Sequence, residues 1–270
     1  MPITAGEFFM FTENPFAGLA TVVVPAVMQV FVVVMIALVV LGTLFDLGHK
    51  RSAAYFFDNW RKSQEKATKQ VGGGEMASLL IQTAAVDVLT SGEFCNQRRR
   101  IAHLLGMYGF VLYAITTVIM VFGYPAPDES TPAVLPVLWH LGALMVCIGG
   151  YWFWFFLRVD VAAEGNSPFR IVRADLFVLS LVANTTLAII WSWLQASGSA
   201  WTALFLALYV ISAVVLFGGV PWSKFSHMFY KPAAAFQKRV EDANGFGSNL
   251  PRPADKPAIF GSARRPARHY

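Results

Sequence analysis

Five long apolar segments constrain this chain more than any other feature of its sequence. Each is long enough to cross a hydrocarbon layer of about 30 Å as an α-helix. They are residues 19–47, 101–124, 134–157, 174–195 and 201–220. Only 14% of the residues are charged, whereas a soluble domain has about 25%. The sequence therefore predicts an all-α integral membrane protein, built as a five-transmembrane-helix bundle.

The basic residues predict how these spans are oriented. All 21 Lys and Arg residues fall in three segments, with 9 in residues 48–100, 3 in residues 158–173 and 9 in residues 222–270. Loops on the cytoplasmic side of a membrane carry an excess of Lys and Arg. We therefore expect the N-terminus outside and the C-terminus in the cytoplasm. The net charge of +5 is accounted for by this topology, and it indicates no nucleic-acid partner.

This topology divides the chain into three parts. Residues 1–18 form a periplasmic N-terminal segment that lacks the basic start of a cleavable signal peptide. Residues 19–235 form the membrane domain, which includes a cytoplasmic loop at residues 48–100, and residues 236–270 form a cytoplasmic tail.

Two further helices are expected on the cytoplasmic side. Residues 75–89 carry apolar side chains at helical spacing, which predicts a short amphipathic helix. Residues 221–242 predict an interfacial helix that leaves the membrane and is interrupted at Pro232.

The cysteine count limits the redox chemistry that the chain can perform alone. Only Cys95 and Cys147 are present, whereas an iron–sulfur cluster normally needs four thiolates. Cys95 is expected to face a reducing cytoplasm, where disulfides are rare. We therefore expect both cysteines to be ordinary packing residues.

Two histidines at the cytoplasmic ends of two spans form the main candidate site. His103 opens the second span and His227 follows the fifth, so both are expected at one membrane level on different helices. A b-type haem needs two neutral imidazoles that face each other from separate helices. Gly106 and Gly109 would leave room for a flat ring near His103. The same pattern also fits histidines at a lipid interface and glycines that serve helix packing.

Four cations lie close to this pair in the sequence. They are Arg98, Arg99, Arg100 and Lys224. Guanidinium and ammonium groups form charge-assisted hydrogen bonds with carboxylates. These four residues are therefore candidate contacts for haem propionates or for a partner subunit at the inner face.

His140 lies at a different depth. It is expected about two turns below the outer surface, roughly 20 Å in depth from His103 at 1.5 Å per residue, so one haem cannot reach both. An ionisable side chain at this depth is a candidate functional residue. It could ligate a second haem, donate a hydrogen bond to a quinone carbonyl or exchange protons. The structural alternative is a hydrogen bond to a neighbouring helix.

At this point the chain resembles a known family. Five spans, a histidine at the start of the second and PWSKFSHMFYKP at residues 221–232 resemble the gamma subunit of respiratory nitrate reductase. RRRIAHLLGMYGFVLYAITT at residues 98–117 and IGG at residues 148–150 are similar to segments of its relatives. The resemblance is closer to the membrane subunits of heterodisulfide reductase and of the quinone-interacting membrane-bound oxidoreductase complex, and to the adenylylsulfate reductase membrane anchor. It covers roughly residues 19–235.

The resemblance implies cofactors, partners and a location. It implies haem b, quinone as an exchangeable substrate, and cytoplasmic redox subunits that carry iron–sulfur clusters and flavin. It also implies a role in a respiratory chain or in sulfur metabolism, at the bacterial inner (cytoplasmic) membrane. By position, His103 and His227 match the two ligands of the haem nearest the cytoplasm.

The chain also departs from the family. In nitrate reductase gamma subunits a second haem takes its ligands at the positions occupied here by Tyr113 and Tyr209. Tyrosine is not an expected ligand of a low-spin b haem. The second haem is therefore expected to be absent, or to be ligated differently through His140.

These observations predict a haem b membrane anchor subunit. It would transfer electrons between the quinone pool and a cytoplasmic iron–sulfur and flavin oxidoreductase, with adenylylsulfate reductase as a candidate partner. The number of haems, the direction of electron flow and the quinone site stay open, with His140 the first candidate for that site and Lys224 the second. The alternative is a structural anchor without haem, or a small transporter. A transporter predicts interrupted spans with paired charges, whereas the apolar segments here are unbroken.

Overall fold

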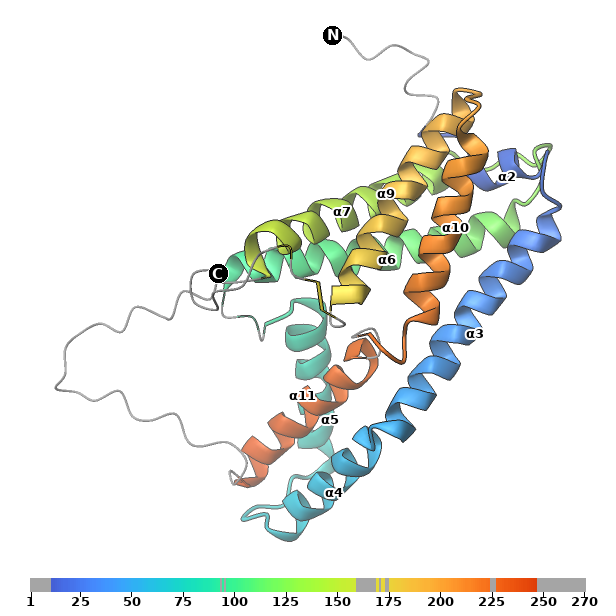
Figure 1. The fold of residues 1–270 in the computed structure, drawn as a ribbon. Coiled ribbons are helices and arrows are strands. Elements are labelled where there is room, and N and C mark those ends of the chain that lie inside the picture. The colour runs from blue at the N-terminus through green and yellow to red at the C-terminus, as the bar shows by residue number, and fades with distance from the viewer. Residues whose placement is uncertain are drawn as a thin grey trace.

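The computed structural model describes residues 11–92, 94, 96–158, 169, 171–172, 175–223 and 227–246 (Figure 1). Every regular element within these residues is a helix. Four of the helical segments are long and apolar enough to cross a membrane. They are α3 (Pro25–His49), α6 (Gln97–Gly123), α7 (Val134–Trp152) with its continuation η2 (Phe153–Leu157), and α9 (Leu176–Ala196). The chain is therefore an all-α, multi-pass membrane protein.

The fifth apolar segment forms a shorter helix. Helix α10 (Thr202–Gly218) has 17 residues and so reaches about 26 Å at 1.5 Å per residue. It packs against α9 and against α3. The predicted helix is present, and its role as a fifth span stays a prediction.

The outer end of the first segment differs from the expectation. A short helix α2 (Pro15–Leu19) comes first, and α3 begins only at Pro25. Proline suits the first position of a helix because its fixed φ fits there and its missing N–H would have no partner. The side chain of Asn14 accepts from the amides of Phe16 and Ala17 and donates to the carbonyl of Tyr124. This cap ties α2 to the outer end of α6.

The second segment begins earlier than expected. Helix α6 starts at Gln97 because the side chain of Asn96 accepts hydrogen bonds from the amides of Arg98 and Arg99, at 2.9 and 3.4 Å. Asparagine is among the best residues for such a cap. The three arginines therefore belong to the first turn of the helix that carries His103.

The remaining helices gather at the end of the bundle where α3 ends and α6 begins (Figure 1). They are α4 (Ser52–Glu65), α5 (Gly73–Gln82), the π-helix η1 (Thr83–Leu89) and α11 (His227–Asn244). We call these four elements the inner helical layer. Helix α11 packs against the other three. The helix expected at residues 75–89 is confirmed as part of α5 together with η1.

Helix α11 corrects the expected interruption at Pro232. The helix continues through this residue from His227 to Asn244. Proline removes the hydrogen bond to the carbonyl four residues earlier, which here belongs to Met228. Because that carbonyl lies in the first turn of α11, the loss leaves the rest of the helix intact.

The core of the bundle depends on close contact between α6 and α7. A Cβ atom placed on Gly109 would lie 2.7 Å from the carbonyl oxygen of Gly142, and one placed on Gly142 would lie 2.7 Å from the amide nitrogen of Tyr113. Small residues at such positions let two membrane helices approach closely. The contact fixes the position of α6, and therefore of His103, against the bundle.

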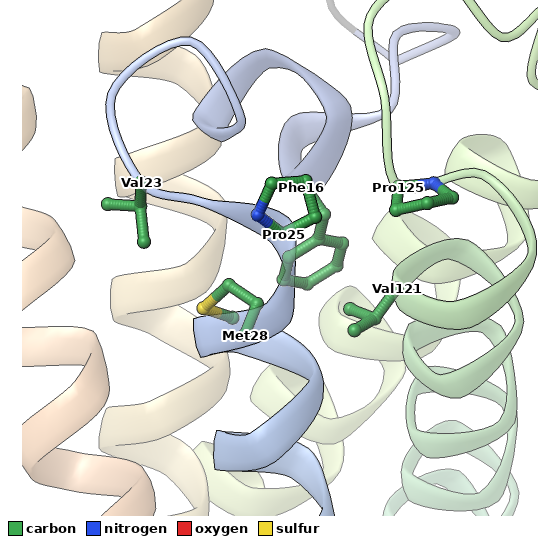
Figure 2. Close-up of a pocket in the computed structure, with 6 residues that line it drawn as sticks. All are labelled: Phe16, Val23, Pro25, Met28, Val121 and Pro125. Carbon is green, nitrogen blue, oxygen red and sulfur yellow. The ribbon is translucent and has the colours of Figure 1, made fainter.

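A small apolar cavity lies where α2, α3 and α6 meet at the outer end. Figure 2 shows its lining by Phe16, Val23, Pro25, Met28, Val121 and Pro125. Its volume is about 10 Å³, which is room for one water molecule at most. It is too small to hold a quinone.

Candidate functional site

The structure places His103 and His227 at the same end of the bundle, the end where α6 begins. His103 lies in the second turn of α6, and His227 is the first residue of α11. His103 interacts electrostatically with His227 and with Lys231. Two imidazoles from helices that are far apart in the sequence therefore lie at one end of the bundle, and a shared site stays a prediction.

Aromatic rings surround this pair. The ring of Phe94 lies 4.9 Å from the ring of His103, centroid to centroid. The ammonium of Lys231 lies 5.6 Å from the centroid of the same Phe94 ring. On the other side, the ring of Phe177 on α9 lies 6.3 Å from that of His227. The site therefore combines two imidazoles, one cation and two apolar rings.

The two glycines near His103 have different roles. A Cβ atom placed on Gly106 would meet no atom within 4 Å, so the surface beside His103 is open at this point. Gly109 is instead closed in by α7, with Met145 Cβ 2.7 Å from the added atom. Gly109 therefore serves helix packing and makes no room for a ring, whereas room for a ring at Gly106 stays a prediction.

The three arginines point in different directions. The Arg99 Nη2 group donates to the carbonyl of Leu157 across 3.1 Å, and Arg100 Nε donates to the carbonyl of Thr90 across 2.6 Å. Arg98 is exposed. A guanidinium has five donors, so a bond to one carbonyl does not preclude a second contact with a carboxylate. Lys224, the fourth predicted cation, lies outside the described residues.

His140 is buried between α7 and α9, away from this site. Its Nδ1 lies 2.7 Å from the carbonyl of Pro136, and its Nε2 lies 3.0 Å from the hydroxyl of Ser192. A carbonyl only accepts, so Nδ1 carries the hydrogen, and Nε2 of the neutral ring accepts from Ser192. This arrangement is the helix-to-helix bond that the sequence left as the alternative. A haem iron or a quinone carbonyl would have to displace Ser192 first.

The tyrosines at the positions of the family's second haem contact one another directly. The hydroxyls of Tyr113 on α6 and Tyr209 on α10 are hydrogen bonded across 2.9 Å. Asn184 Oδ1 lies 3.4 Å from the Tyr113 hydroxyl, and Asn184 Nδ2 donates to Ser212. At this level the two phenol side chains therefore occupy the space between α6 and α10.

Two fully buried tryptophans complete this packing. The ring of Trp139 lies 5.3 Å from that of Tyr113, and the ring of Trp191 stacks on Tyr209 at 5.5 Å. Aromatic pairs at these distances are favourable beyond their burial alone. The outer half of the bundle is therefore a packed core at the level where a second haem would lie.

A larger cavity opens at the outer end, with a volume of about 500 Å³. It is lined mainly by polar and acidic side chains, including Glu13, Glu129, Thr131, Ser192 and Gln195. Its size falls within the range of about 300 to 1,000 Å³ typical of ligand sites. Ser192, which lines this cavity, is also the residue hydrogen bonded to His140.

Within the part of the chain that the structure describes, no cluster of three or more His, Cys, Asp and Glu side chains could hold a metal ion. Ligation by two histidines needs no such cluster. Sequence reasoning missed Phe94 and Lys231 as neighbours of His103. Lys231 follows His227 by four residues, which is one helical turn, so this spacing places the two side chains on one face of α11.

Comparison with known proteins gives limited information. No family model matches the chain, and no solved structure matches it. A curated relative, citrate utilization protein B of Escherichia coli, is 26% identical over 169 residues, which cover 57% of this chain and 43% of the relative. The chain thus spans less than half of the length of this relative. The similarity does not establish a family, and the name of the relative does not bear on haem or quinone.

Proposed function

We propose that this chain is a haem b membrane anchor subunit. It would transfer electrons between the quinone pool and a cytoplasmic oxidoreductase that carries iron–sulfur clusters and flavin. The observation that supports this proposal is that α6 and α11 approach the same Phe94 ring, through His103 and through Lys231, which lies one turn after His227. The similarity of residues 98–110 and 221–232 to the nitrate reductase gamma family supports the same function.

The residues present fit one haem. His103 and His227 would hold the iron from α6 and α11, and the open surface at Gly106 would admit the edge of the ring. Arg98, Arg99, Arg100 and Lys224 are the candidate contacts for its propionates. When bound, a b-type haem supplies one-electron transfer, while the protein supplies ligation, orientation and an apolar surrounding. The Tyr113–Tyr209 contact argues against a second haem.

The proposed topology has five spans, with the N-terminus outside and the C-terminus in the cytoplasm of a bacterial inner membrane. Helix α10 would be the fifth span, since 17 residues lie at the lower limit for crossing a bilayer. The distribution of the basic residues supports this orientation. The inner helical layer would then face the cytoplasm, where the redox partner would dock.

The quinone site belongs at the inner end in this proposal. Because Nε2 of His140 accepts from Ser192, the neutral ring offers no N–H to a quinone carbonyl. Lys224, the second candidate from the sequence, lies next to the proposed haem site in the chain. An adenylylsulfate reductase is the partner that the family resemblance favours. Electrons would flow into quinone if that partner oxidises sulfite, and out of quinone if it reduces adenylylsulfate.

A reduced-minus-oxidised absorption spectrum with haem quantitation tests the proposal. The purified wild-type chain is expected to hold one haem, which is lost in His103→Ala and in His227→Ala. His49→Ala is a matched control, because His49 stacks on Phe45 at the inner end of α3 and has no role in ligation. A wild-type chain without haem would overturn the proposal in favour of a structural anchor.

A further inference from the structure

We propose that η1 is a brace that holds His227 in place against His103, with Asp87 as its positioning residue. This inference rests on the proposed function, since it concerns the two residues that would ligate the haem. It is carried by hydrogen bonds that join η1 to both of the helices that bear these histidines.

The first side of the brace joins η1 to α6. The hydroxyl of Tyr108 donates to the carbonyl of Leu89 across 2.6 Å, and Nε of Arg100 donates to the carbonyl of Thr90 across 2.6 Å. These two donors lie on α6 on either side of His103 in the sequence. The end of η1 is therefore fixed to the same turns of α6 that carry the first imidazole.

These hydrogen bonds also satisfy the carbonyl groups at the C-terminal end of η1. The last carbonyls of a helix have no partner within the helix, and those of Leu89 and Thr90 are satisfied here by side chains of α6. A guanidinium at this end also interacts favourably with the helix dipole. The attachment to α6 is thus part of the local stability of η1.

The second side of the brace joins η1 to α11. Asp87 forms a two-pronged ion pair with Arg239, in which Nε lies 2.7 Å from Oδ2 and Nη2 lies 3.0 Å from Oδ1. The side chains of Asp87 and Arg239 are 12% and 28% exposed. Paired hydrogen bonds of this kind fix the relative geometry of two groups more tightly than one bond does. Arg239 lies on the helix that begins with His227.

The π-helical winding of η1 places these groups. Thr83, at its start, is 2% exposed, and its hydroxyl donates to the carbonyl of Leu79 across 2.8 Å. A π-helix makes wider turns than an α-helix, and such segments occur frequently at functional sites. The Asp87 side chain faces α11, while the carbonyls of Leu89 and Thr90 face α6. We infer that the wider turn sets the angle between these two directions.

Carbon monoxide binding measures the position of His227 directly. A haem with two histidine ligands leaves no position for carbon monoxide, whereas loss of one ligand opens a position. Asp87→Asn removes the charge and keeps the shape of the side chain. In this variant we expect the fraction of reduced haem that binds carbon monoxide to rise about tenfold. This factor corresponds to the free energy of hydrogen bonds to a charged group, which the variant loses. An unchanged fraction would overturn the proposal.

Rescue and a matched control separate this role from general destabilisation. The exchanged pair Asp87→Arg with Arg239→Asp is expected to restore the wild-type spectrum. Glu75→Gln breaks a neighbouring ion pair with Lys69 that does not involve Arg239, and it is expected to leave carbon monoxide binding unchanged. A rise in Glu75→Gln equal to that in Asp87→Asn would contradict a specific role for Asp87.

Hydrogen exchange provides a readout that needs no haem. Backbone amides of α11 are expected to exchange about tenfold faster in Asp87→Asn, since exchange follows local opening. If the wild-type chain holds no haem, the proposed function fails while this measurement still tests the brace. Unchanged exchange in α11 would overturn the brace whatever the haem content.

Discussion

Ser192 donates a hydrogen bond to Nε2 of His140 across 3.0 Å, and this contact joins α9 to α7 in the outer half of the bundle. His140 is 1% exposed and Ser192 is 4% exposed. A buried polar group is costly unless it is hydrogen bonded. The pair thus accounts for an ionisable side chain inside the membrane without a cofactor.

The first prediction concerns this contact. His140→Ala is expected to lower the free energy of unfolding by about 1 to 3 kcal/mol, because the hydroxyl of Ser192 loses its acceptor in a buried position. The haem content is expected to stay at the wild-type value. Thermal unfolding of the purified chain and haem quantitation check both parts. Loss of haem in His140→Ala would instead make this residue a ligand.

The second prediction concerns the packed tyrosines. The double variant Tyr113→His with Tyr209→His introduces histidine at both positions. We expect it to bind no more haem per chain than the wild type, because Trp139 and Trp191, both 0% exposed, occupy the surrounding space. Haem quantitation per chain is the measurement. A gain of one haem would show that the outer half can open to admit a ring.

The third prediction compares the two glycines of α6. Gly109→Leu is expected to destabilise the bundle by more than about 1 to 3 kcal/mol, the usual cost of overpacking, because the added atoms meet the backbone of α7. Gly106→Leu is expected to leave thermal stability close to that of the wild type and to reduce haem binding, because the new side chain would fill the open surface beside His103. Normal haem binding in Gly106→Leu would place the ring elsewhere.

The fourth prediction concerns pH. Burial raises the pKa of Glu241 above its ordinary value of 4.5, the hydrogen bond from Gln237 opposes this shift, and the charge of Asp242 adds to it. The folded chain therefore favours the protonated form. The contribution of Glu241 to stability is therefore fully present below its ordinary pKa of 4.5 and is lost as the pH rises through its raised pKa.

Glu241→Gln tests this dependence. The variant is expected to exceed the wild type in thermal stability at neutral pH, and the difference is expected to vanish below the ordinary pKa of the carboxyl. Asp58 provides the opposite sign, because its hydrogen bond from Lys62 and the charge of Lys62 lower its pKa. The contribution of Asp58 to the stability of the folded chain is present above the ordinary pKa of its carboxyl. This contribution is lost as the pH falls through the lowered pKa. If the thermal stability of Glu241→Gln changes with pH in parallel with that of the wild type, Glu241 is not the source of this pH dependence.

The apolar segments and the charge pattern were sufficient to predict the all-α membrane class and the approximate limits of α6, α7 and α9. Uninterrupted apolar length is a local property, so a single sequence reveals it directly. The start of α3 was misplaced because the residues before Pro25 are as apolar as those after it. The proline and the cap by Asn14 decide where the helix begins.

The candidate site was predictable in part. That His103 and His227 lie at one end of the bundle could be predicted from topology alone, because each follows from its place at the end of an apolar segment. The partners of Asp87 and Arg239 could not be predicted, because their pairing depends on how the inner helical layer folds back on α6. The same holds for Ser192 and His140, whose contact depends on the rotation of α7 against α9.

The closed contact between Tyr113 and Tyr209 has a consequence for energy conservation. In the proposed arrangement the haem, the quinone and the soluble partner all meet at the cytoplasmic side. Electrons passing between them would cross little of the electrical field of the membrane, where one charge moved through 100 mV corresponds to about 2.3 kcal/mol. Protons for the quinone would come from the same side. Such an enzyme exchanges electrons with the quinone pool without generating or consuming membrane voltage.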